Sequence, residues 1–204
     1  MEIRFTLVGD GPFDCALLPI IRWALGQNTR VSGFYGEFAD PRRLPKLGEG
    51  LRMRLLTAVE FYPCNLLFVH RDAESQTREQ RLQEIHEASR ALRSVHVPII
   101  PIRMTEAWLL FAEDAIRRAA GNPNGTAALN LPPLNRVERR IDPKYDLRQA
   151  LLGASMLSGR QLRKFDENAA AKRVAELITD FAPLRQLSAF RDFETDLARA
   201  LSVI

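Results

Sequence analysis

Acidic and imidazole side chains follow three of the strongly apolar stretches in the first half of the chain. In chain order they are Asp10, Asp14, His70, Asp72, Glu74 and Glu106. Carboxylate oxygens are the ligands that Mg²⁺ prefers, and one or two of them commonly bind this ion together with substrate phosphate. An imidazole next to such a group can act as a general base near neutral pH. The set therefore indicates metal-assisted or acid–base chemistry on a phosphate ester.

These side chains can act together only if the elements before them end at the same edge. Short apolar and β-branched stretches predict strands at 3–8, 30–35, 65–69 and 97–102. Apolar residues at helical spacing predict helices at 14–25, 50–61 and 75–94. The alternation predicts an α/β fold, TOPRIM- or Rossmann-like, with a mainly parallel sheet of about four strands and helices on both faces. Two prolines in 97–102 favour an edge position for that strand.

Ligands of a parallel α/β sheet bind outside the carboxyl ends of its strands. We therefore expect the six side chains to meet at one rim. From residue 105 onward the sequence predicts helices and no strand, with helical patterns at 105–120, 134–140, 144–155, 167–179 and 183–201. No Gly/Ser-rich linker separates the two parts, so we predict an α/β domain over 1–104 and a helical part over 105–204 that packs on it as a cap.

Composition and motifs exclude several classes of protein. The 204 residues are 46% hydrophobic and 26% charged, which is ordinary for a globular protein. The longest apolar runs are far shorter than the roughly 20 residues of a membrane span, so no membrane association is expected. Neither G-x-G-x-x-G nor G-x-x-x-x-G-K occurs, which argues against a dinucleotide oxidoreductase or a Walker-type ATPase. Two cysteines are too few for a disulfide scaffold, and we expect a cytoplasmic protein.

The basic residues are strongly biased towards arginine. Of 29 basic residues only four are lysine, and the formal net charge is +4. Guanidinium groups bind phosphate in a bidentate manner, so an arginine-rich surface suits nucleic acid as a partner. A GC-rich genome produces the same bias, so the composition alone does not decide between the two explanations.

Each candidate site residue also has an ordinary structural role. Asp10 lies between two glycines, where Asp commonly stabilises a turn. Asp72 could cap the helix predicted at 75–94, and Glu106 would be favoured in the first turn of a helix by the helix dipole. An isolated His70 is more often a hydrogen-bonded core residue than a ligand. The expected convergence of three strand ends on one rim favours the functional interpretation over these separate ones.

Several motifs, in order, resemble a known fold. Asp10-Gly11-Pro12-Phe13-Asp14 resembles the Glu-Gly-x-x-Asp/Glu turn of TOPRIM domains, the topoisomerase–primase metal-binding fold, and His70-Arg71-Asp72 stands where that fold carries Asp-x-Asp. The segment MTEAWLL at 104–110 resembles an E-A-W-L-L signature, and IDPK at 141–144 and FRDFE at 190–194 extend the likeness over most of the chain. Together they resemble a TOPRIM-like prokaryotic family of unknown function, often encoded beside an AAA or ABC-type ATPase in defence-like operons.

The resemblance implies a metal-dependent nuclease, or a related phosphodiester-processing protein, in prokaryotic genome defence. It implies Mg²⁺ or Mn²⁺ as cofactor and nucleic acid and an ATPase as partners. The implied metal ligands are Asp10, Asp72 and Glu74. The implied catalytic residues are Asp10, His70, Asp72 and Glu106. The residues expected to contact phosphate are Arg71, Arg103 and Lys144.

Two departures from the TOPRIM pattern leave the activity open. Asp10 replaces a glutamate and is one methylene shorter, and His70 replaces the first aspartate of the pair. Imidazole suits softer transition metals better than Mg²⁺, whereas Mn²⁺ accepts mixed nitrogen and oxygen ligands. Two alternatives to a nuclease therefore remain. The chain could be a non-catalytic subunit whose helical part docks an ATPase, or a small-molecule hydrolase or nucleotide-binding protein that uses the same rim.

Overall fold

The computed structural model of the chain describes residues 1–45 and 50–204. Its strands are β1 (Glu2–Val8), β2 (Gly33–Phe38), β3 (Leu66–His70) and β4 (Val95–Ile99). Its α-helices are α1 (Leu17–Gly26), α2 (Leu51–Phe61), α3 (Arg78–Ser89), α4 (Glu113–Ala119), α5 (Pro143–Ser155), α6 (Gly159–Leu162), α7 (Glu167–Leu177) and α8 (Ser188–Leu201). Its 3₁₀ helices are η1 (Asp14–Ala16), η2 (Thr105–Leu109), η3 (Leu134–Arg139) and η4 (Ala182–Gln186). None of the described helices is both long and apolar enough to cross a membrane.

The four strands form one parallel sheet in the order β2-β1-β3-β4. This confirms the predicted α/β fold with a parallel sheet of four strands and a helical C-terminal part. The two central strands are buried on both faces, and alternate side chains enter different cores. Phe5 and Phe68 pack in one core, and Val8 and Val69 pack in the other. β4 lies at an edge of the sheet, where its internal Pro98 is tolerated.

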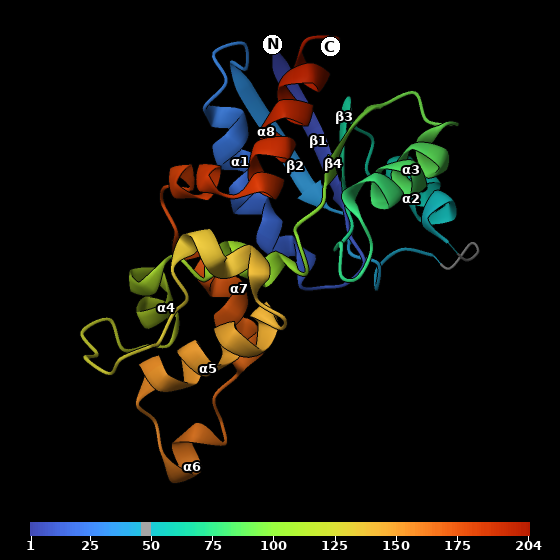
Figure 1. Cartoon of the computed structure of the whole chain (residues 1–204). Helices are drawn as coiled ribbons and strands as arrows, with labels where there is room; N and C mark the ends of the chain where they lie inside the picture. Colours follow the sequence, from blue (N-terminus) through green and yellow to red (C-terminus); the bar gives the residue numbers. More distant parts are fainter. Residues whose placement is uncertain (46–49) are drawn as a thin grey trace.

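Helices cover both faces of the sheet and also its carboxyl end (Figure 1). α1 and α8 lie on one face, and α2 and α3 lie on the other. α4, α5 and α7 lie beyond the ends to which the strands point, whereas both chain termini lie at the opposite end (Figure 1). α8 packs on β4, and α7 packs on α1 and η1. The second half of the chain therefore contributes a layer to the sheet as well as a cover over its rim.

Several element boundaries differ from those predicted, and β4, for example, covers Val95–Ile99 rather than 97–102. The second strand begins at Gly33 rather than at residue 30, where it pairs with Glu2 at the start of β1. The helix predicted from residue 75 begins at Arg78, because Thr77 and Gln80 form a reciprocal capping box. The helix predicted over 105–120 is split into η2 and α4.

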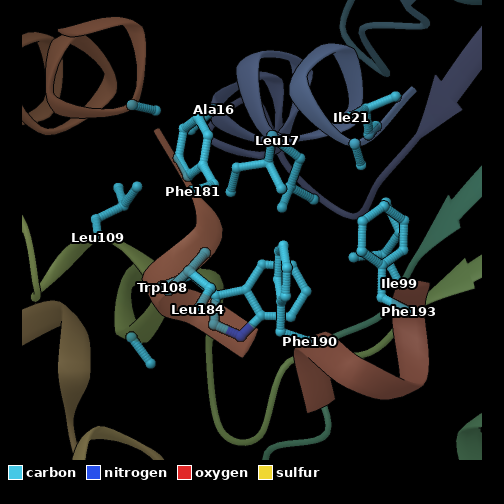
Figure 2. Packing of buried hydrophobic residues seen from close by; sticks show 14 of the residues in the cluster. Ala16, Leu17, Ile21, Ile99, Trp108, Leu109, Phe181, Leu184, Phe190 and Phe193 are labelled. Carbon is cyan, nitrogen blue, oxygen red and sulfur yellow. The ribbon is translucent and has the colours of Figure 1, made fainter. Parts of the chain in front are cut away.

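Trp108 of η2 connects the two halves of the larger core. Its side chain is fully buried, and its ring meets that of Phe190 from α8 edge-on, with centroids 5.3 Å apart. Figure 2 shows Trp108 and Phe190 together on one side of this core, with Leu17 and Ile21 of α1 on the other. Because aromatic side chains bury the largest apolar areas, this contact contributes strongly to holding η2 and α8 on the sheet.

We predict that Trp108→Ala lowers the free energy of unfolding by about 3–5 kcal/mol, the usual cost of emptying a large buried aromatic site. Urea denaturation followed by circular dichroism measures the change. Phe61→Ala is the matched control, because Phe61 is 54% exposed and its removal should cost less than about 1 kcal/mol. A loss below about 1 kcal/mol in Trp108→Ala would contradict this role of the tryptophan.

Candidate functional site

The turn after β1 places Asp14 at the carboxyl ends of the strands. Oδ2 of Asp14 accepts hydrogen bonds from the backbone N–H groups of Asp10, at 2.7 Å, and Gly11, at 3.0 Å. Gly9 permits this closure, because a Cβ at that position would lie 2.3 Å from the same oxygen. The carboxylate of Asp14 is buried as a result, and it lies beside the last residue of β3.

That last residue, His70, lies between two carboxylates and is 1% exposed. Its Nδ1 is 3.2 Å from Oδ2 of Asp14, an ion-pair contact without hydrogen-bond alignment. Its Nε2 is 3.1 Å from Oδ1 of Asp72 and 2.9 Å from Oγ1 of Thr105. These three contacts join the chain segments that follow β1, β3 and β4.

The two carboxylates keep His70 charged. Burial disfavours the imidazolium, but the close negative charge of Asp14 and the hydrogen bond and charge of Asp72 outweigh it and raise the pKa of His70 to about 10. The pKa of Asp14 is lowered, since burial is outweighed by His70 and by the backbone N–H groups of the turn. At neutral pH the centre of the rim is thus an imidazolium between two carboxylates. This differs from the neutral imidazole that a general base or a metal ligand requires.

Thr105 is the fourth residue of this cluster and contacts both His70 and Asp72. Its backbone N–H donates to Oδ1 of Asp72 at 3.0 Å, at the start of η2. Asp72 therefore does not cap the helix after β3, whose cap is Thr77, but holds the beginning of the segment after β4. Because Asp72 and His70 both bind Thr105, the chain turns here into a short 3₁₀ helix rather than one continuous α-helix.

Arginine side chains bind Asp10 instead of a phosphate. Oδ1 of Asp10 accepts a hydrogen bond from Nη1 of Arg54 in α2, at 2.6 Å, and from Nη1 of Arg71. The other terminal nitrogen of Arg71 lies 3.0 Å from Oε1 of Glu84 in α3. The guanidinium of Arg71, predicted to clamp phosphate, is thus engaged by two carboxylates of the protein itself.

Glu74 and Arg103 lie on a backbone extension beyond β3 and β4. The N–H of Glu74 donates to the carbonyl of Arg103, and Nη1 of Arg103 donates to the carbonyl of Glu74, both at 3.2 Å. The two residues have left-handed φ values of 52° and 69°. The Glu74 side chain is 61% exposed, and its carboxylate is 3.6 Å from Arg81. Glu74 therefore binds its neighbours in this extension instead of joining Asp10 and Asp72.

Glu106 is buried and faces a cavity of about 410 Å³ between the rim and the helices α5 and α7. Its carboxyl group makes no hydrogen bond to another residue of the described chain. Burial, assisted by the charges of Asp72 and Asp14, raises the pKa of Glu106 to about 7 against the opposing effects of its own backbone N–H and of Lys144. Lys144 lines the same cavity, so the structure places this predicted phosphate ligand beside Glu106 rather than beside Arg71 and Arg103.

The predicted metal ligands do not fit a bound Mg²⁺ or Mn²⁺. Asp10 is bound by two guanidinium groups, Asp72 is bound by His70 and Thr105, and Glu74 is turned away from both. Within residues 1–45 and 50–204, no three His, Cys, Asp or Glu side chains are placed to hold a metal ion together. The rim does bring Asp10, Asp14, His70, Asp72 and Glu106 to one end of the sheet, but protein cations occupy the positions between the first four.

Sequence reasoning missed several partners of these residues. Arg54 and Glu84 come from the helices α2 and α3, and no motif distinguishes them from other charged residues on a solvated helix face. Thr105 was visible only as the start of a helical pattern. Asp14 was visible as the last position of the turn motif, and its burial explains why an acidic residue stands there.

We predict that His70 remains an imidazolium throughout the neutral range. Its pKa rises from 6.5 to about 10 on folding, so its contribution to stability is complete below pH 6.5 and is lost as the pH rises towards 10. The ring ¹⁵N chemical shifts at pH 7.5 should identify one charged imidazole. His96, whose pKa is lowered by burial, is the neutral internal control in the same spectrum.

The matched variant is His70→Gln, which cannot titrate at this position. It should be less stable than the wild type at pH 6.5, and the difference should shrink between pH 6.5 and 10. A neutral His70 at pH 7.5, or a constant difference over that range, would contradict the imidazolium.

Comparisons with protein-family models, curated proteins and solved structures found no match to this chain. The likeness to TOPRIM domains therefore rests on the motifs in the sequence, and a function must be argued from the geometry of the rim.

Proposed function

We propose that this chain is a non-catalytic TOPRIM-like subunit that docks an ATPase partner in a prokaryotic genome-defence system. The observation that supports the proposal is the pairing of the acidic rim with cations of the protein itself. His70 lies between Asp14 and Asp72, and Arg54 and Arg71 bind Asp10.

The charge balance explains why this pairing disfavours metal catalysis. Metal-assisted phosphodiester cleavage needs carboxylates that are free to hold a divalent cation near the substrate. Here three carboxylates are matched by one imidazolium and two guanidinium groups. A metal ion that binds between Asp14 and Asp72 would have to displace the buried imidazolium of His70, and breaking a buried ion pair costs about 3–5 kcal/mol.

The role of the partner comes from the resemblance and not from the rim. The family that the motifs resemble is often encoded beside an AAA or ABC-type ATPase. A subunit without its own metal chemistry would contribute binding and geometry to such an assembly, while the ATPase contributes the energy of nucleotide hydrolysis.

A metal-dependent nuclease is the second candidate, and one observation favours it. Oδ2 of Asp72 and the carboxyl group of Glu106 make no hydrogen bond with another described residue, and Asp72 contributes to raising the pKa of Glu106. Mg²⁺ is often held by only one or two carboxylates together with substrate phosphate. The same measurements that test the first candidate decide between the two.

We predict that the wild-type chain does not bind Mn²⁺ or Mg²⁺ at millimolar concentration and that His70→Asp does. Replacing the imidazolium with a third carboxylate leaves three acidic groups without a cation, so a divalent ion should raise the melting temperature of this variant by several degrees. His70→Asn is the control, because it removes the charge without adding a carboxylate. Calorimetry and thermal unfolding with each metal provide the measurements.

Cleavage of linear, supercoiled and single-stranded DNA and of RNA is assayed in parallel, with each metal and with and without the neighbouring ATPase. We expect no cleavage that differs between the wild type and Asp72→Ala. Metal-dependent cleavage that is lost in Asp72→Ala would establish the nuclease instead. The docking role requires an AAA or ABC-type ATPase encoded beside this chain and a complex of the two proteins in size-exclusion chromatography, and the lack of either would contradict it.

A further inference from the structure

We propose that the cavity beside the rim binds a mononucleotide-like ligand, with its phosphate at Lys144 and the edge of its base at Glu106. The cavity lies between the turn after β1, η2 and the helices α5 and α7. It contains none of the ion pairs of His70 or Asp10, so the inference holds whether or not the rim is catalytic.

The size of the cavity and the apolar part of its mixed lining suit a small ligand with a planar ring. Its volume of about 410 Å³ falls within the range of roughly 300–1,000 Å³ that is typical of small-molecule sites. Phe13 and Phe165 contribute aromatic surface, and Leu147 and Leu151 contribute aliphatic surface. Flat ring systems pack well against such side chains.

Lys144 is the basic residue of this lining that is available to bind an anion. It stands in the first turn of α5 and makes no ion pair with any residue of the described chain. The neighbouring Arg148 is paired with Glu167, and Asp166 caps α7 by accepting a hydrogen bond from the N–H of Ala169 at 2.9 Å. An exposed ammonium group in the lining of a cavity is a suitable partner for a phosphate.

Glu106 supplies the second polar contact and is a buried acidic residue of the lining. It is 6% exposed, and its carboxyl group makes no hydrogen bond to another described residue. Its own backbone N–H acts on the carboxyl group, which leaves further hydrogen-bonding capacity, so a ligand group that donates to it or accepts from it gains affinity. The N–H and ring-nitrogen edge of a nucleobase offers both kinds of group.

The order of these contacts defines the class of ligand. Both side chains line the cavity, but Glu106 is buried, whereas Lys144 is exposed to solvent. A ligand that fits both therefore carries a hydrogen-bonding ring at its inner end and an anionic group at its outer end. Inorganic phosphate or a sugar phosphate satisfies only Lys144, and a nucleoside satisfies only Glu106 and the aromatic lining.

The full-length chain is titrated by calorimetry with AMP, GMP, CMP and UMP, and separately with inorganic phosphate, ribose 5-phosphate and the four nucleosides. We expect at least one mononucleotide to bind about tenfold or more tightly than its nucleoside and than either phosphate probe. Lys144→Met should weaken this binding about tenfold or more. Lys164→Met is the matched control, because Lys164 is exposed and lies outside the cavity, and it should leave the affinity unchanged.

Glu106→Gln should alter the order of affinity among the four mononucleotides, because an amide presents one donor and one acceptor in place of a carboxyl group. If this buried variant does not fold, the pair of lysine variants at exposed positions still decides the outcome. Absence of binding by all four mononucleotides, equal affinity for inorganic phosphate, or an equal effect of the two lysine substitutions would each overturn the proposal.

Discussion

The buried charge cluster of Asp14, His70 and Asp72 is the interaction on which the rest of the carboxyl end depends. It joins the segments after β1, β3 and β4, because Asp72 and His70 also bind Thr105. An imidazolium at 1% exposure is tolerated only because it has a carboxylate on each side. If either carboxylate were removed, the buried imidazolium would keep only one negative partner. The three segments must therefore meet in the arrangement that places both carboxylates beside His70.

That constraint extends from the charged rim into the apolar core. Thr105 begins η2, and the same short helix carries Glu106 towards the cavity and Trp108 into the packing against Phe190 of α8. A change at His70 would therefore alter more than local electrostatics, since it would release the start of η2. The hydrogen bonds of Thr105 thus fix the start of the segment that carries both Glu106 and Trp108.

The protein cations at the rim also decide which chemistry the fold favours. In a metal site of the TOPRIM type, a divalent ion balances the acids and remains available to a phosphate. In this chain the balance comes from His70, Arg54 and Arg71, whose charges are engaged by Asp10, Asp14 and Asp72. This pairing supports our proposal of a docking subunit, and the cavity beside the rim lies outside these ion pairs.

The sequence alone determined the parallel sheet, the edge position of β4 and the rim to which the strand ends bring their polar residues. These properties follow from apolar periodicity, from the backbone demands of Pro98 and from the fixed direction of parallel strands, all of which are local or nearly so. The helix starts that moved, such as that at Thr77, depended on capping side chains whose geometry is also local but shifts a boundary by a few residues.

Only the tertiary structure decided which charges meet. Arg54 reaches Asp10 from 44 residues away, and nothing in the spacing of α2 indicates that it rather than another arginine does so. Spacing places a Cα at the rim but does not set the direction of its side chain, so Glu74 could leave the predicted metal set through a left-handed backbone turn. The charge of His70 was likewise decided in three dimensions, because its pKa depends on burial and on carboxylates from two different strand ends.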